Sequence, residues 1–434
     1  MKTFYLLCFC LLANISLLHS ARIVSGPIPY HFTHQMLSFG FLLEHTDSLR
    51  VDLIDPLENT RQSKIIKTAD FPTYKNHTPV KFIFEGLKAN YTYKIEVRLN
   101  AKKVRQLKSE LKTAPLPGNK DFSFMLGSCA YTPPKTLKWM HPGIEERIYP
   151  NMIEKETDFM LWMGDYLYYF KKHFKSFDGM MRRHVFKRKN EKLNKFLMSR
   201  PQYAAWDDHD YGPNNSDMHF PQKDAALEMW KFYWNNPAYG LDSVPGCFFD
   251  FSYQDCDFFM LDNRFYRTEE SDTGAMLGEG QMNWLMQKLK NSQATFKFIM
   301  AGSQVFNEIT KEECFCKYTQ EREQLLDFIN KEKISGIIWL SGDRHHSSLF
   351  KVEDIAAYSY YEYTCSAITT FRSKLKRSNE YINPVRVEGT LVQQQNFGII
   401  NISGPADDRK CLIETFDNRG KLIWDYSISA NELK

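Results

Sequence analysis

The sequence lacks any strong imbalance of charge, and after its first twenty residues it lacks any long apolar run. Its 434 residues include 56 lysines and arginines against 52 aspartates and glutamates, which gives a formal net charge of +4. This balance argues against a nucleic-acid-binding role and against an anionic membrane as the main partner. No segment after residue 20 approaches the roughly 20 apolar residues that a membrane helix needs, so we expect no stable membrane span. No repeat or low-complexity tract stands out.

The first twenty residues have the layout of a secretory signal peptide. A basic start is followed by an apolar middle and by small residues that end near Ser20. We therefore predict that residues 1–20 are removed, and that the mature chain is secreted, periplasmic or held at the cell surface. A retained N-terminal anchor is the alternative interpretation of the same stretch.

Cysteine is scarce in the predicted mature chain. Two of the nine cysteines lie in the signal segment, and seven remain: Cys129, Cys247, Cys256, Cys314, Cys316, Cys365 and Cys411. An odd number in an exported chain leaves at least one unpaired or bound to another group, and the surroundings of Cys129 make it the candidate. Disulfides are open to Cys247 and Cys256 and to the neighbours Cys314 and Cys316, with the pairing undetermined.

Composition and local pattern predict two domains. The chain is 43% hydrophobic and 15% aromatic, enough for a large core. Between residues 21 and 115, short alternating runs separated by turn residues predict a small β-sandwich. Tyr91 and Tyr93 follow Gly86 in a segment that resembles the tyrosine corner of fibronectin-like and Ig-like sandwiches. Residues 114–118, with two prolines and a glycine, read as a linker.

The second domain, residues 121–434, has the rhythm of an α/β fold. Apolar strands are expected at residues 122–126, 159–163, 203–206, 258–261, 296–301 and 337–340. Helical spacing between them predicts helices at 225–234, 281–290 and 320–329. From residue 358 onward the pattern returns to strands, which we expect to complete a second sheet.

Polar residues follow four of these strands where each one ends. The segments are Gly127-Ser128-Cys129, Gly164-Asp165-Tyr166-Leu167-Tyr168, Trp206-Asp207-Asp208-His209-Asp210 and Ser341-Gly342-Asp343-Arg344-His345-His346. Open α/β sheets place their sites at such strand ends. The segments supply thiolate, phenolate, carboxylate and imidazole, a set suited to an iron-like trivalent ion beside a harder divalent one. Two metal ions about 3.5–4 Å apart, bridged by Asp165, can hold a hydroxide and polarise a phosphoryl oxygen, which indicates phosphoester hydrolysis.

Together the four motifs resemble those of the alkaline phosphatase D (PhoD) family of metallophosphoesterases, which run Ser-Cys, Gly-Asp-x-x-Tyr, Asp-Asp-His-Asp/Glu and Ser-Gly-Asp-x-His. The resemblance covers residue 122 to the C-terminus, and that family also carries an N-terminal β-sandwich. It implies a four-layer α/β/β/α sandwich of the metallophosphoesterase type. It also implies a phosphoric mono- or diester hydrolase with two or more metal ions, Fe³⁺ and Ca²⁺, or zinc or manganese instead.

The same resemblance assigns metal ligands and a catalytic histidine. For the iron-like ion it implies Cys129, Asp165, Tyr168 and His345, and for the calcium-like ion Asp165, Asp208, Asn214 and Asp343. The direct ligand among Asp207, Asp208, Asn214 and Asn215 stays open, because Pro213 stands beside the expected amide. The family is similar to purple acid phosphatases, and by that likeness His209 is a general acid or a phosphate binder.

Three further positions are candidates for contact with the substrate. Arg344 either acts on the substrate as a catalytic residue or reaches back to a carboxylate. His346 is a candidate substrate-binding residue, but it alternates with His345, so one of the two must point away in an extended segment. Arg264 is a second substrate-binding candidate, although its neighbour Asp262 favours an ion-pair network that supports the site.

Residues 170–200 are rich in lysine and arginine: Lys171, Lys172, Lys175, Arg182, Arg183, Lys187, Arg188, Lys189, Lys192, Lys195 and Arg200. A solvated helical face is the usual reason for such a run. Because it directly follows Gly-Asp-x-x-Tyr, the run also predicts a basic rim that concentrates anionic substrate. Asn-x-Ser/Thr sequences begin at Asn76, Asn90, Asn214 and Asn401 and would accept glycans in a eukaryotic secretory route.

The main hypothesis is a monomeric phosphoesterase acting on small-molecule or lipid phosphate esters. One alternative is a phospholipase-type phosphodiesterase that uses the same site. The other is a non-enzymatic surface binding protein whose working part is the β-sandwich. The complete set of ligand residues at four strand ends favours an enzyme, because a binding module has no use for it.

Overall fold

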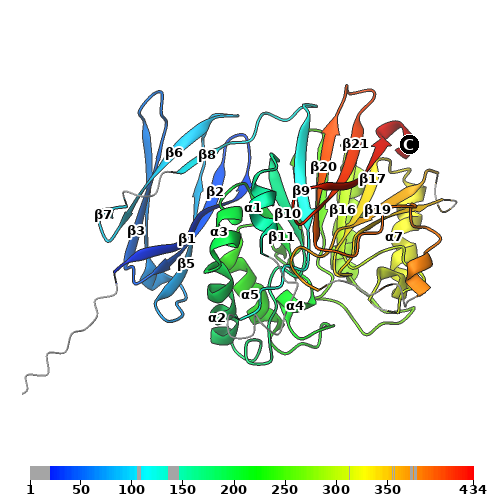
Figure 1. Ribbon diagram of the computed structural model, residues 1–434, viewed down its shortest axis with the longest axis horizontal. Helices are drawn as coiled ribbons and strands as arrows, with labels where there is room; N and C mark the ends of the chain where they lie inside the picture. Colours follow the sequence, from blue (N-terminus) through cyan, green and yellow to red (C-terminus); the bar gives the residue numbers. More distant parts are fainter. Residues whose placement is uncertain are drawn as a thin grey trace, which may run out of the picture.

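The computed structural model describes residues 20–104, 109–134, 146–311, 313–353, 355, 357–371, 375 and 379–434. An all-β part is followed by a part in which strands and helices alternate, and the chain ends in three antiparallel strands (Figure 1). The predicted signal peptide lies outside the described residues except for Ser20. Among the helices that the structure describes, none combines the length and the apolar character that crossing a bilayer demands.

The N-terminal part consists of two antiparallel sheets. One has the order β1-β2-β5, and the other the order β4-β3-β6-β7 with β8 also paired to β6. Their inward-facing side chains, such as Phe39 and Val51, belong to one buried cluster. The Tyr93 hydroxyl accepts a hydrogen bond from the backbone N–H of Lys88 at 2.9 Å, the kind of contact that a tyrosine corner makes. The elements are β1 (Arg22–Phe32), β2 (Leu37–Glu44), β3 (Ser48–Ile54), β4 (Arg61–Lys67), η1 (Thr68–Asp70), β5 (His77–Phe84), β6 (Thr92–Leu99), β7 (Lys102–Lys103) and β8 (Ser109–Lys112).

Two six-stranded mixed sheets form the rest of the molecule. The first has the order β11-β10-β9-β20-β21-β22, in which β9, β10 and β11 are parallel. Its strands are β9 (Phe122–Gly127), β10 (Phe159–Met163), β11 (Gln202–Ala205), β20 (Asn396–Ser403), β21 (Lys410–Asp417) and β22 (Leu422–Ser429). The second has the order β14-β15-β16-β17-β19-β18, with β15, β16, β17 and β19 parallel. Its strands are β14 (Phe249–Tyr253), β15 (Cys256–Met260), β16 (Phe296–Gly302), β17 (Ile337–Ser341), β18 (Ser348–Val352) and β19 (Tyr360–Thr364).

Both faces of each central strand are buried, which explains why these strands read as continuous apolar runs. Phe124 and Phe258 come from different sheets, share one core and meet edge to face with ring centroids 5.1 Å apart. On the outer face of the first sheet, Trp162 packs with the helices α1 (Ile148–Ile153), α2 (Phe177–Arg188), α3 (Glu191–Leu197) and α5 (Lys223–Tyr233). On the outer face of the second sheet, Trp339 packs with α6 (Glu279–Asn291) and α7 (Thr319–Lys331).

The remaining elements are short. They are α4 (Asp208–Tyr211), the hairpin strands β12 (Gly240–Leu241) and β13 (Val244–Pro245), and the 3₁₀ turns η3 (Phe315–Lys317), η5 (Asn379–Ile382) and η6 (Ala430–Leu433). The strands and helices that periodicity predicts lie within two residues of their expected bounds. For helices α2 and α3 the sequence indicated only a solvated helical face in the basic run, without bounds, because polar and basic residues obscure their apolar periodicity.

The N-terminal part packs firmly on the rest through β1. His31 Nδ1 lies 3.2 Å from the hydroxyl of Tyr203 on β11, and the Phe32 ring contacts the rings of Tyr203 and Tyr253. The Tyr30 hydroxyl donates to the carbonyl of Tyr233 at the end of α5, at 2.7 Å. Aromatic side chains of both parts therefore form a continuous core.

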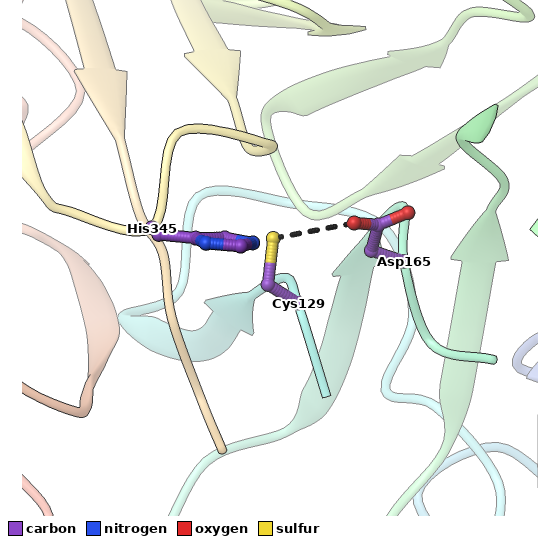
Figure 2. Close-up of side chains that lie close together, drawn as sticks. All are labelled: Cys129, Asp165 and His345. Carbon is purple, nitrogen blue, oxygen red and sulfur yellow. Dashed lines mark hydrogen bonds between the residues drawn. The ribbon is translucent and has the colours of Figure 1, made fainter. Parts of the chain in front are cut away.

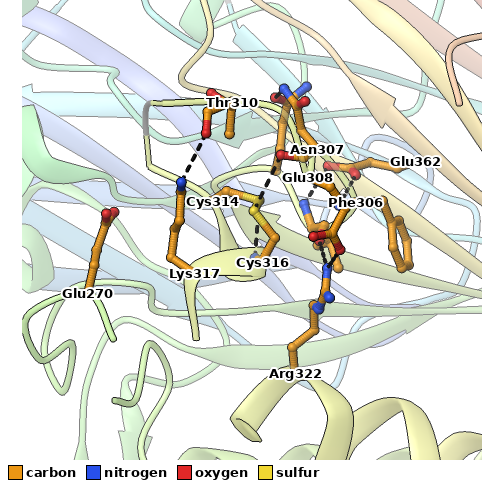
Figure 3. Close-up of a disulfide and its surroundings, with 12 residues drawn as sticks. Glu270, Phe306, Asn307, Glu308, Thr310, Cys314, Cys316, Lys317, Arg322 and Glu362 are labelled. Carbon is orange, nitrogen blue, oxygen red and sulfur yellow. Dashed lines mark hydrogen bonds and ion pairs between the residues drawn. A yellow bond between two sulfur atoms is a disulfide. The ribbon is translucent and has the colours of Figure 1, made fainter. Parts of the chain in front are cut away.

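The structure contains a disulfide between Cys314 and Cys316 (Figure 3). Among the described residues, Cys247 and Cys256 are free and buried, so the pairing considered for them is not formed. Cys247 belongs to the cluster outside the first sheet, whereas Cys256 lies in the core between the two sheets. Cys129, Cys365 and Cys411 are also free and buried.

Candidate metal centre

The strand-end segments of the two sheets converge on one place. Cys129, Asp165, Asp207 and Asp343 each stand two residues after the last residue of their strands β9, β10, β11 and β17. Because β9, β10 and β11 are parallel neighbours, their carboxyl ends lie at one edge of the sheet. The second sheet contributes its own segment from β17, so the site lies where the ends of both sheets meet.

Tight turns direct these side chains inward. Cys129, Asp165, Asp343 and His345 have φ values of 56°, 57°, 61° and 54°, in the left-handed region that residues other than glycine seldom adopt. Such conformations cost on the order of 1–3 kcal/mol and persist only where the surroundings enforce them. Here the Ala130 N–H donates to the Asp165 carbonyl at 2.8 Å, and a Cβ on Gly164 would come within 2.6 Å of the Asp207 Cβ.

A first group of ligand atoms comes from Cys129, Asp165 and His345, which lie within 4.8 Å of one another (Figure 2). The Cys129 Sγ is 3.5 Å from Asp165 Oδ2. The Tyr168 hydroxyl donates to the same oxygen at 2.9 Å. The structure thus brings together all four residues that were predicted to bind the iron-like ion.

A second group consists of Asp165, Asp208 and His209, whose ligand atoms also lie within 4.8 Å of one another. The Asp208 carboxylate accepts from the backbone N–H groups of His209 at 2.8 Å and Asn215 at 2.7 Å. The His209 ring is 4.3 Å from that of Tyr168, centroid to centroid. Asp165 is common to both groups, as expected of the residue predicted to bridge two ions.

The electrostatics of the site favour a cation. Burial, and then the neighbouring carboxylates of Asp208 and Asp207, raise the pKa of Asp165 well above its usual range. Burial and the Asp207 carboxylate raise the pKa of Asp343 to about 8. Burial and then the Asp165 carboxylate likewise raise the pKa of the Cys129 thiol. A multivalent cation would replace this mutual repulsion with attraction.

Two carboxylate oxygens support the same conclusion. Asp165 Oδ1 and Asp207 Oδ2 are buried and have no hydrogen-bond partner among the described residues. A buried acceptor without a partner costs about 1–3 kcal/mol, and more when it is charged. Metal coordination would satisfy these atoms, so the residues present fit a metal centre.

The expected ligand Asn214 lies in the loop after α4. Its side chain is exposed, and its amide nitrogen donates to the Asn215 Oδ1. A turn in which the Ser216 N–H donates to the Pro213 carbonyl at 3.1 Å carries it outward. The prediction that Asn214 is a metal ligand is therefore not supported, and Asp208 is the residue of this segment that lies in the site.

Arg344 and His346 also need correction. The Arg344 guanidinium is buried and pairs with the Glu380 carboxylate at 2.7 Å, so it reaches back to a carboxylate instead of pointing toward a substrate. His346 is fully buried, with Nδ1 2.9 Å from the Arg344 carbonyl. The segment is a bend and not an extended strand, so the expected alternation does not apply, but the burial of His346 excludes direct contact with a substrate.

Arg264 is not a substrate contact but a buried counter-charge. Its Nε donates to Asp207 Oδ1 at 2.6 Å, and its Nη1 donates to Glu313 at 3.0 Å. Glu313 also pairs with Arg267 at 2.9 Å. Its side chain has no exposed surface, so Arg264 fixes Asp207 from behind and agrees with the ion-pair alternative.

Several supporting residues were not found from the sequence. Glu313 lies next to the Cys314–Cys316 disulfide and far from every motif in the chain. Asp210 accepts from the N–H groups of Tyr166 at 3.2 Å and of Asp207 at 3.1 Å, which ties two motifs together. Ser366 accepts from the His345 N–H at 3.0 Å. Only Asp210 carried a signal, because it closes the Asp-Asp-His-Asp motif.

The basic run is divided between two environments. The side chains of Lys171, Lys172, Lys175, Arg182, Lys189, Lys192 and Lys195 are exposed, as expected of a solvated face. Arg183, Lys187, Arg188 and Arg200 are instead buried. These four residues therefore do not contribute to a basic rim. The first three contact the loop after β9 and the end of α5, and Arg200 donates to the Met152 carbonyl.

Comparison with known proteins agrees with this geometry. A family model described as PhoD-like phosphatase matches residues 127–409. Alkaline phosphatase D of Bacillus subtilis (strain 168) is 22% identical over 253 residues, a match that spans 46% of this chain and 43% of that protein. The chain thus matches less than half the length of that curated relative.

Two solved structures share the fold. A structure of PhoD superposes with a TM-score of 0.72 at 16% identity and covers 94% of this chain and 90% of its own. The purple acid phosphatase PPD1 from yellow lupin (Lupinus luteus) seeds gives a TM-score of 0.67 at 12% identity, covering 93% of this chain and 74% of its own. At these identities the likeness shows a shared arrangement of mixed α/β sheets.

Proposed function

Because this chain belongs to the PhoD-like phosphatase family, we propose that it is a secreted phosphoesterase of the alkaline phosphatase type that hydrolyses phosphate mono- or diesters. The observation that carries the proposal is the position of Asp165. One carboxylate is shared by two groups of ligand atoms, and its Oδ1 is buried without a hydrogen-bond partner among the described residues.

We assign the metals from the chemistry of the predicted ligands. Cys129, Tyr168 and His345 with Asp165 suit Fe³⁺. For the second ion we propose Asp208 and Asp343 with Asp165 as ligands suited to Ca²⁺, and we leave His209 of the second group for the substrate; zinc or manganese are the alternatives. Two such ions would supply a hydroxide nucleophile and neutralise the charge that develops on the phosphoryl oxygens.

The side chains of the site have separate tasks. Asp208 is held in place by two backbone N–H groups, and the Arg264 guanidinium lowers its pKa against the opposing effect of burial, so it stays a carboxylate. His209 is half-buried, stacks on Tyr168 and lies beside Asp208, where it can hold a proton for the leaving oxygen. Arg264 neutralises Asp207 without entering the reaction.

We propose three properties of the whole chain. The two facing sheets with helices outside them form the four-layer α/β/β/α sandwich of the metallophosphoesterase type, and the N-terminal sheets form a domain of the fibronectin or Ig type. The mature protein acts outside the cytoplasm after removal of residues 1–20. It acts as a monomer on small-molecule or lipid phosphate esters.

One observation favours diesters with an apolar group, including the phospholipase-type alternative. Phe371 is 43% exposed, and its ring lies 6.2 Å from that of Tyr131, which in turn stands edge-on to Tyr168 at 5.1 Å. This places one exposed apolar ring near the metal centre, where the organic group of an ester could pack.

Hydrolysis of p-nitrophenyl phosphate, bis-p-nitrophenyl phosphate and phosphatidylcholine vesicles by the purified mature chain tests the function. We expect turnover of at least one ester, dependent on metal and lost in Asp165→Asn. The ratio of the three rates ranks monoester, diester and lipid. A folded, metal-loaded chain that cleaves none of them would overturn the proposal and favour the binding-protein alternative.

A further inference from the structure

Helix α2 reaches under the loop that carries Cys129. The Lys187 ammonium is fully buried and donates to the Ala130 carbonyl and, at 2.8 Å, to the Thr132 hydroxyl. The Arg183 guanidinium donates to the Thr132 carbonyl at 2.9 Å. Residues 183 and 187 are four apart and share one helix face, so both side chains of α2 can bind the same loop, at Ala130 and Thr132.

The loop that Lys187 and Arg183 contact is itself part of the metal centre. Ala130 receives Lys187 on its carbonyl and donates its N–H to the Asp165 carbonyl at 2.8 Å. The Cys129 carbonyl accepts from the N–H of Thr370 at 3.2 Å. The backbone around Cys129 is thus fixed by Thr370 at its own carbonyl and by Asp165 and Lys187 at Ala130. Lys187 therefore contacts the residue that follows Cys129 and that is hydrogen-bonded to Asp165.

The burial of Lys187 is energetically unfavourable, which indicates that this residue serves to fix the geometry of the loop. Within the described part of the chain, both hydrogen-bond acceptors of Lys187 are neutral oxygens, and its ammonium lies 5.1 Å from the Tyr166 ring centroid. Burial and the nearby Arg183 guanidinium lower the pKa of Lys187. The carboxylates of Glu146 and Asp210 oppose this effect, but the groups that Lys187 contacts directly are neutral oxygens. Burial of an ammonium on neutral acceptors is unfavourable, so an apolar side chain would serve stability better here.

We infer that Lys187, together with Arg183, is a positioning residue of the metal centre that acts through Ala130 to fix Cys129 against Asp165. This inference rests on the proposed function. A looser loop would let the Cys129 Sγ move away from the other ligand atoms, which weakens metal binding more than it weakens the fold.

The variant Lys187→Met tests this role, with Co²⁺ as the probe because a thiolate ligand gives it a charge-transfer absorption band. We expect the variant to bind Co²⁺ roughly 10–100-fold more weakly and to lose intensity in that band, since supporting residues of metal sites have effects of this size. Arg182→Met is the matched control, because Arg182 is exposed on the same helix, and it should behave like the wild type.

A second variant guards against loss of folding. Thr132→Val keeps the shape of the side chain, removes one acceptor of Lys187 and should weaken Co²⁺ binding in the same direction. The positioning role is wrong if folded Lys187→Met binds Co²⁺ like the wild type and shows an unchanged band. If Lys187→Met does not fold, the same result with Thr132→Val leads to the same conclusion. A wild-type chain without Co²⁺ affinity would overturn the metal centre itself.

Discussion

At the scale of single residues, the site is a set of carboxylates that cannot all be charged without a cation. Asp165, Asp207 and Asp208 are buried, and Asp343 is half-buried. The Asp207 and Asp208 carboxylates raise the pKa of both Asp165 and Asp343, while Arg264 pairs directly with Asp207. A metal-free protein must therefore either bind protons at the site or accept repulsion. This makes the stability of the metal-free chain a direct report on the site.

Asp343 gives a pH dependence of defined sign. Its pKa is raised from the ordinary 3.8 to about 8 by burial and by Asp207. The folded state therefore keeps a proton that the unfolded state releases, so stability is full below about pH 4 and is lost as the pH rises toward 8. In the presence of a metal chelator, the free energy of unfolding of the wild type should fall between pH 5 and 8. For Asp343→Asn we expect this fall to be smaller by about 1–3 kcal/mol. Urea unfolding measures this, and parallel curves for the two proteins would contradict it.

Asp165→Asn separates charge from shape at the bridging position. The amide fills the same volume but is a poor bridge between two cations, so we expect loss of bound metal and of at least 100-fold in activity, on the order expected when a metal ligand is lost. The metal-free variant should be at least as stable as the metal-free wild type, because a buried repulsive charge is gone. Metal analysis and thermal unfolding check both, and an unstable variant would mean that Asp165 has a structural role.

At the scale of elements, the sequence allowed prediction of the strands but not of what supports their ends. Strands β9, β10 and β17 are buried on both faces, so they stand out as apolar runs, and their ligands follow at a fixed distance. Glu313, Ser366 and Glu380 come from loops far away in the chain, and no spacing predicts them.

The differences from the predictions have local causes. Asn214 was predicted as a metal ligand, but a turn after Pro213 exposes its side chain. The basic composition of α2 suggests a solvated face, whereas Arg183, Lys187 and Arg188 bind carbonyl oxygens beneath the sheet. The composition of a helix shows how many charged residues it has, but not which of them face solvent and which face the core.

The contact between β1 and β11 predicts a second pH dependence of opposite sign. Burial lowers the pKa of His31 from 6.5 to about 4. The unfolded chain takes up a proton before the folded chain does, so stability is full above pH 6.5 and is lost as the pH falls toward 4. In His31→Gln, the unfolding temperature should fall less than that of the wild type when the pH is lowered from 7 to 5. An equal loss in both proteins would assign the effect to other groups, such as His173, whose pKa is also lowered to about 4.

At the scale of the whole molecule, the N-terminal sheets and the α/β part share one core. Phe32 is buried and contacts Tyr203 and Tyr253 across the boundary. We expect Phe32→Ala to cost about 3–5 kcal/mol of unfolding free energy, as for other buried phenylalanines. Calorimetry should show one transition at a lower temperature. Two separate transitions in the wild type would mean that the parts are independent.

This continuity bears on function. The β1 strand rests on β11, whose end leads directly into Asp207 and Asp208, so the N-terminal sheets support the strand that presents the site. N-terminal sheets that pack in this way support the site structurally. The non-enzymatic alternative would instead need a free working surface on that part.

The most direct test of the account is a crystal structure of the mature protein with data collected across the iron absorption edge and at a wavelength sensitive to calcium. We expect an iron peak among Cys129, Asp165, Tyr168 and His345, and a second metal peak between Asp165 and Asp208, with Asp165 bound to both. Well-ordered density with only water at these positions, from a protein purified with iron and calcium present, would contradict the two-metal centre.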